Sequence, residues 1–218
     1  MAKTRIAAAL LTIAFAGSAA AQTPPAAPAI DPFEQVMAAS RVADFARRQK
    51  DPQALIVAAR MLQEAPITDS ATAGPAAGPP VAGAFTPDGL FAEAKAMAKG
   101  DTALLMQISL AQSSGSKGVL SSAFGRGLVR IVQDMGARAS YVFPIKAKGG
   151  ERLRIGAIGG ANTKMVMRMR DKAGKVVCTD DSGDYAPVCS LDPKTAGDYR
   201  VEIVNRSDAP SRTVILSN

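Results

Sequence analysis

The side chains that could do chemistry in this sequence are charged ones, because the chain contains no histidine. Histidine is the commonest general base and a frequent metal ligand, so its absence excludes every Ser-His and Cys-His nucleophile pair. An enzyme would need a carboxylate, lysine or serine mechanism, and no spacing in the sequence marks one out. We therefore predict no catalytic residue and favour a non-catalytic protein. The alternatives are an accessory protein of a secreted enzyme and a histidine-independent hydrolase.

The basic residues are concentrated in one stretch of a chain whose formal net charge is +7. Within this stretch, 151–157 and 164–170 alternate apolar and basic residues, as half-buried strands do. If the two strands are adjacent, four arginines share one outward face and two lysines lie near it: Arg152, Arg154, Arg168, Arg170, Lys146 and Lys148. Such a face predicts a site that binds anionic groups. The expected ligands are lipid phosphate groups or acidic polysaccharide, and nucleic acid is not expected to bind. The alternative is that these cations only keep an exposed sheet face soluble.

An acidic loop is the one candidate for a metal site. Asp180, Asp181 and Asp184 could supply oxygen ligands to calcium, although their spacing is not that of an EF-hand. A solvated turn between two strands is the interpretation that we favour. The methionines Met165, Met167 and Met169 could suggest a copper site, but their alternation is what the core face of a strand requires.

The two cysteines, Cys178 and Cys189, are predicted to form a disulfide. In an oxidising compartment, two cysteines so close in sequence are expected to form a disulfide and not a redox pair, and their spacing is far from a CxxC motif.

The N-terminus has the organisation of a cleavable signal peptide over residues 1–21. Lys3 and Arg5 precede an apolar run that is too short to span a bilayer, and Ala19–Ala21 provides small residues for cleavage. We expect a periplasmic or secreted protein, cleaved after Ala21, whose mature chain has no transmembrane segment.

The remaining chain is predicted to be an α+β protein. A Pro/Ala tail (22–32) precedes a helical hairpin (33–64), a Pro/Gly/Ala linker (65–86), a second hairpin (87–112) and a hinge (113–126). Asp51 and Asp101 occupy equivalent N-cap positions, which indicates a weak repeat and fits a four-helix bundle or a short helical-repeat array. The hairpins are a candidate interface for a protein partner.

From residue 127 the period changes to alternation in short strands, which predicts an antiparallel β-sandwich or jelly roll over 127–218.

Several segments of the C-terminal half follow a known order. They are the aromatic strand 140–143, Gly149–Leu153, the strand and turn 165–174, the acidic loop 179–182 and the closing strand 196–201. In this order they resemble the bacterial pre-peptidase C-terminal domain, over less than half of the chain. The resemblance implies a small β-sandwich that acts as a non-catalytic binding or stability module and supplies no active site. The family usually has an acidic residue before the 165 strand, where this chain has Asn162-Thr163-Lys164, and this departure weakens an inherited calcium site.

Overall fold

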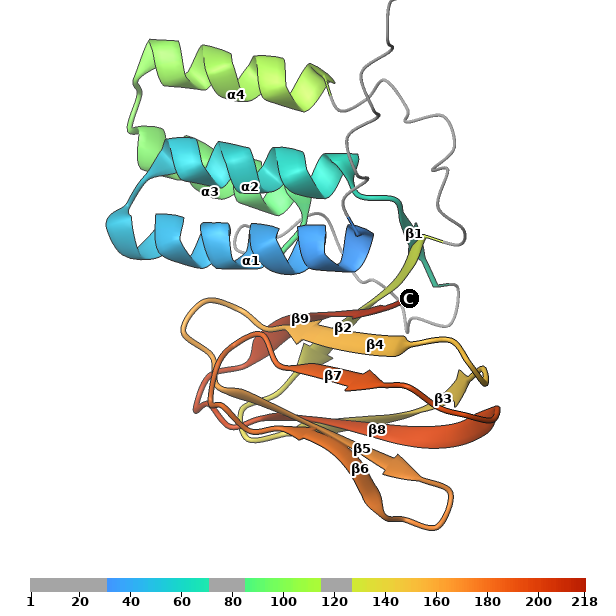
Figure 1. The fold of residues 1–218 in the computed structure, drawn as a ribbon. Coiled ribbons are helices and arrows are strands. Elements are labelled where there is room, and N and C mark those ends of the chain that lie inside the picture. The colour runs from blue at the N-terminus through green and yellow to red at the C-terminus, as the bar shows by residue number, and fades with distance from the viewer. Residues whose placement is uncertain (1–30, 71–84, 115–126) are drawn as a thin grey trace, which may run out of the picture.

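The computed structural model describes residues 31–70, 85–114 and 127–218. The predicted signal peptide and most of the predicted tail and hinge lie outside the described residues. The described chain has four helices and nine strands, in an α+β arrangement as predicted (Figure 1). They are α1 (Pro32–Gln49), α2 (Pro52–Glu64), β1 (Ile67–Asp69), α3 (Pro87–Ala98), α4 (Thr102–Ser114), β2 (Leu128–Met135), β3 (Ser140–Ala147), β4 (Leu153–Ile158), β5 (Met165–Asp171), β6 (Val176–Asp180), β7 (Val188–Leu191), β8 (Gly197–Asn205) and β9 (Ser211–Ser217).

The helix starts follow from local sequence. Asp31 and Asp51 cap α1 and α2, each with proline at the next position, where a missing N–H costs nothing. Asp101 accepts a hydrogen bond from the backbone N–H of Leu104 and caps α4 in the same way. Lys50 and Lys99 both end their helices in the left-handed conformation, so the two hairpins turn alike.

The strands form two sheets packed face to face. The five-stranded sheet has the order β1-β2-β9-β4-β7, and the four-stranded sheet has the order β3-β8-β5-β6. All pairings are antiparallel except that of β1 with β2. β1 lies within the segment predicted to be a linker. It forms because its backbone pairs with β2 and because Asp69 accepts two hydrogen bonds from Arg130.

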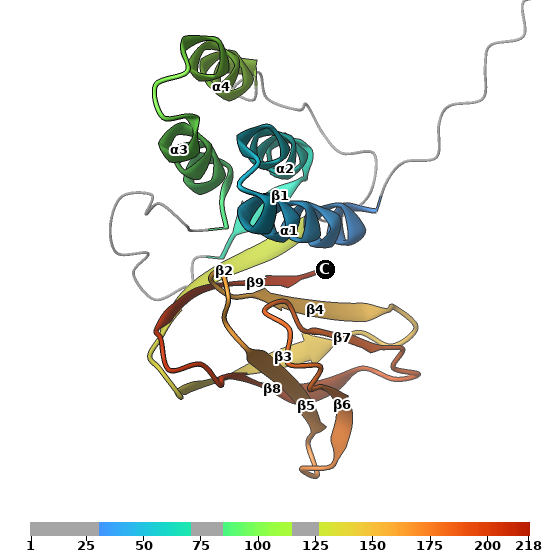
Figure 2. The same ribbon diagram turned by 90° about the vertical axis from the view of Figure 1, so that its left-hand side faces the viewer.

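The helices cover the outer face of the five-stranded sheet, with α1 directly on it (Figure 2). One apolar cluster joins the two parts: Phe33 and Leu55 from the helices belong to the same cluster as Ile158 and Leu216 from the sheet. The hydroxyl of Tyr185 donates a buried 2.8 Å hydrogen bond to the carbonyl of Ser40 across this boundary.

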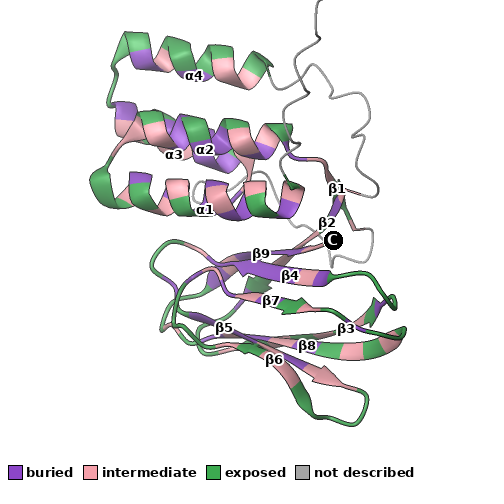
Figure 3. Ribbon diagram, viewed as in Figure 1, coloured by how far each residue is buried: buried purple, intermediate pink, exposed green. Residues whose placement is uncertain are grey.

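A second apolar cluster fills the space between the sheets. Met165, Met167 and Met169 are fully buried in it, where they pack with residues such as Ile155 of the opposite sheet and Ile203 of the neighbouring strand β8. The alternation of these methionines therefore serves core packing. Figure 3 shows the buried residues on both sides of the five-stranded sheet, which is the central layer of the molecule. No helix among the described residues is long and apolar enough to cross a membrane.

Candidate functional site

The predicted arginine face is divided by the topology. β4 pairs with β7 and β9 in the five-stranded sheet, whereas β5 pairs with β6 and β8 in the four-stranded sheet. The two strands are therefore not adjacent, and the condition for a shared arginine face is not met. Arg152 and Arg154 lie with the five-stranded sheet, and Arg168 and Arg170 lie on the outer face of the other. Alternation shows which residues of one strand share a face, but it does not show which strand lies beside it.

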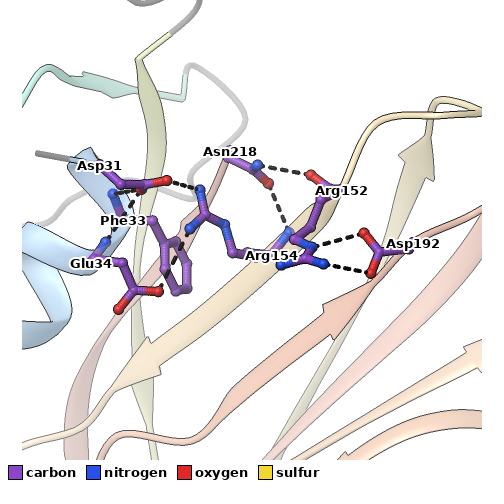
Figure 4. Close-up of polar contacts among 7 residues, drawn as sticks. All are labelled: Asp31, Phe33, Glu34, Arg152, Arg154, Asp192 and Asn218. Carbon is purple, nitrogen blue, oxygen red and sulfur yellow. Dashed lines mark hydrogen bonds and ion pairs between the residues drawn. The ribbon is translucent and has the colours of Figure 1, made fainter. Parts of the chain in front are cut away.

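Arg154 is largely covered between the sheet and the first turn of α1, and 17% of its side chain stays exposed (Figure 4). Its Nη2 donates a 2.7 Å hydrogen bond to Asp31, and its Nη1 lies 3.6 Å from a carboxylate oxygen of Glu34. The guanidinium carbon lies 4.9 Å from the centre of the Phe33 ring, a distance at which a cation–π contact is favourable. Its Nε is buried without an acceptor. Arg154 thus joins helix to sheet, and its guanidinium already has two carboxylate partners within the chain.

The carboxylate of Asp31 couples this junction to pH. Burial alone would raise the pKa of Asp31. The hydrogen bonds from Arg154 and from the N–H groups of Phe33 and Glu34 outweigh burial and hold the pKa below its ordinary value. The ionised carboxylate therefore stabilises the folded state above the ordinary carboxyl pKa, and this contribution is lost as the pH falls through the lowered pKa.

We expect Asp31→Asn to remove this pH-dependent contribution while keeping the helix cap, because asparagine caps helices as well as aspartate does. The free energy of unfolding, measured in urea across a pH series, should differ most between variant and wild type near neutrality. The difference should shrink as the wild-type carboxylate becomes protonated. A difference that is constant with pH would contradict this expectation.

Arg152 and the two lysines lie at the edge of the sandwich. Arg152 donates two hydrogen bonds to Asp192, and these hydrogen bonds lower the pKa of Asp192. Lys148 pairs with Glu151 at 3.2 Å. Lys146, Lys148 and Arg152 line one pocket of about 560 Å³. Two of its three cations therefore already have carboxylate partners within the chain.

The outer face of the four-stranded sheet holds the remaining predicted residues. Arg168 lies opposite Glu202 of β8 and pairs with it at 3.5 Å. Arg170 lies directly opposite Arg200 of β8, with Pro144 of β3 on the other side of Arg200. Arg170 donates one hydrogen bond to the carbonyl of Gly174. Among the described residues, neither Arg170 nor Arg200 has a carboxylate within ion-pair distance.

Two like charges directly opposite on neighbouring strands are unfavourable unless an anion lies between them. Here the pair lines a hollow of about 280 Å³ together with Lys172, and Asp171 and Asp198 also line it. Asp171 accepts a hydrogen bond from the backbone N–H of Lys175 and so closes the turn. Sequence reasoning missed Arg200. The alternation of Asp198, Arg200 and Glu202 with Tyr199, Val201 and Ile203 was the signal that could have found it.

The acidic loop uses its carboxylates for local structure. Asp180 accepts hydrogen bonds from the N–H groups of Ser182 and Val188, Asp181 pairs with Arg206, and Asp184 accepts from the N–H of Tyr185. Over residues 31–70, 85–114 and 127–218, no group of three or more Cys, Asp or Glu side chains is arranged to hold a metal ion.

The disulfide between Cys178 and Cys189 is formed as predicted. It joins β6 of the four-stranded sheet to β7 of the five-stranded sheet, so it links the two layers of the sandwich at one edge. Cys189 is fully buried.

No protein-family model matches the chain, and no curated protein is similar to it in sequence. Solved structures are similar to part of it. The pre-peptidase C-terminal domain of a collagenase from Bacillus anthracis has 11% identity and a TM-score of 0.32, and the match covers 40% of this chain and 84% of that one. A mitogen derived from Yersinia pseudotuberculosis has 12% identity and a TM-score of 0.32, over 42% and 84%. A periplasmic inhibitor of g-type lysozyme from Aeromonas hydrophila has 14% identity and a TM-score of 0.31, over 45% and 93%. The domain type that the sequence resembles is thus among the matched structures.

Proposed function

We propose that this protein is an exported, non-catalytic module of the cell envelope that binds anionic lipid headgroups through the outer face of its four-stranded sheet. The observation that carries the proposal is the pair Arg170 and Arg200, two arginines directly opposite each other with no carboxylate partner among the described residues. A phosphate group between them would satisfy both guanidinium groups, and Lys172, which lines the same hollow, would add charge beside it.

Exposed apolar side chains on the same face favour a lipid surface over acidic polysaccharide. Val176 lies opposite Arg170, and Val142 lies opposite Glu202, with about 40% and 47% of their surfaces exposed. Cations beside exposed aliphatic groups suit the boundary between headgroups and acyl chains. The disulfide supports export to the periplasm or the medium, because such bonds persist in oxidising compartments.

The test is sedimentation of the protein with vesicles of phosphatidylcholine that contain about one third phosphatidylglycerol, over a salt series. A basic residue near an anionic bilayer contributes about 1 kcal/mol, so R170Q/R200Q should weaken binding roughly 30-fold. The matched control is R41Q/R48Q, which removes the same charge from exposed positions on α1. Equal losses of vesicle binding in the two variants would mean that net charge, and not the pair Arg170 and Arg200, accounts for binding. Binding to an acidic polysaccharide but not to vesicles would overturn the choice of lipid.

A further inference from the structure

The described helices leave an apolar groove between α2 and α4, on the part of the molecule away from the sandwich (Figure 1). Its volume is about 810 Å³, and its apolar lining comes from Ile56 and Val57 of α2 and from Leu110 and Ala111 of α4. Val57 and Leu110 are 52% and 64% exposed. Met106, one turn before Leu110 on α4, is 62% exposed.

α4 is unusual for a surface helix because none of its residues is charged and its polar residues are not gathered on one face. Its sequence, TALLMQISLAQSS, contains no charged residue, and only Leu104 and Ile108 are buried. Figure 3 shows that most of this helix is exposed or half-buried. Its exposed side carries the large apolar side chains of Met106 and Leu110 beside uncharged polar residues such as Gln107. The uncovered side of α4 therefore has the composition of an interface.

The geometry of the groove fits one more helix. α2 and α4 each have 13 residues and run in the same direction, while α3 contacts both of them (Figure 1). These three helices occupy three positions of a small bundle, and the groove is the fourth. A guest helix of similar length would span about 20 Å and place apolar residues at i, i+3, i+4 and i+7 against Val57 and Leu110.

The charges of the groove select the kind of helix. None of the residues that line it is acidic, and its one cationic lining residue is Arg60. Arg60 forms no ion pair within the part of the chain that the structure describes. The whole chain has 26 Lys and Arg against 19 Asp and Glu, so two copies repel each other. An acidic partner complements both the groove and the chain. We propose that the groove between α2 and α4 binds an acidic amphipathic helix of another protein, with a carboxylate of that helix facing Arg60.

The probe is a fluorescent synthetic peptide of about 16 residues, with leucine at the a and d positions of a heptad and glutamate beside them. Its twin has lysine in place of every glutamate. Fluorescence anisotropy with the whole protein should show the glutamate peptide binding at least about 10-fold more tightly than its twin. Leu110→Ser should weaken binding of the glutamate peptide by about 10-fold, because it removes a large apolar side chain from the interface. Arg60→Gln should reduce the preference for glutamate over lysine.

The control variants are chosen on α1, outside the groove. Phe45→Ser removes an exposed apolar side chain, and Arg41→Gln removes an exposed cation, so both should leave peptide binding unchanged. Because Leu110 is exposed, Leu110→Ser should also leave the thermal midpoint unchanged. Equal binding of the two peptides, equal effects of Leu110→Ser and Phe45→Ser, or no binding would each overturn the proposal. Dimerisation that Leu110→Ser abolishes would assign the groove to a second copy instead.

Discussion

Phe33→Ala is expected to lower the free energy of unfolding by about 3–5 kcal/mol, the usual cost of removing a buried phenylalanine ring. The ring is 1% exposed and lies in the first turn of α1, between that helix and β4. The far side of the ring packs closely against Gly156. A Cβ atom added to Gly156 would lie 3.2 Å from Phe33 Cζ. The ring also supports the guanidinium of Arg154, which would lose its cation–π contact in the variant.

The measurement is urea unfolding followed by circular dichroism, with Phe45→Ala as the matched control. Phe45 is on the same helix but is half exposed, so its replacement should change stability by no more than about 0.5 kcal/mol. Because helices and sheet share one apolar cluster, a single transition is expected in the wild type. Equal effects of the two alanine variants would contradict the role of Phe33. A wild type that unfolds in two separate steps would contradict the shared core.

Removing the disulfide by C178A/C189A is expected to cost about 3 kcal/mol, since the bond limits the freedom of the unfolded chain. The sequence separation of the two cysteines is 11 residues, but their bond connects different sheets. Alanine is the appropriate replacement, because serine at the fully buried position 189 would add an unpaired hydroxyl group.

Thermal unfolding with and without a reducing agent provides the control for this variant. Reduced wild type should unfold close to C178A/C189A, and the variant itself should not respond to the reducing agent. If oxidised wild type and variant have the same thermal midpoint, the disulfide contributes nothing to stability. Packing between the two sheets then holds the sandwich together without it.

Several features could be predicted from the sequence because their causes are local. Asp31 and Asp51 begin helices because a side chain and the next N–H groups lie within three residues of each other. Met165, Met167 and Met169 share a buried face because consecutive side chains of a strand point to opposite sides. The α+β class could be predicted from hydrophobic periodicity and the disulfide from cysteine spacing, and both patterns are visible over short stretches of sequence.

The partners of each strand were decided only by the tertiary structure. β4 and β5 are neighbours in sequence, but backbone hydrogen bonds with distant strands place them in different sheets. Arg154 is therefore covered by α1, while Arg170 lies opposite Arg200 on the other side of the sandwich. Contacts between distant residues also produce β1, which pairs with a strand about 60 residues away. They also produce the groove between α2 and α4. The period of a sequence fixes which side of an element is apolar, but what covers that side depends on contacts between residues far apart in the chain.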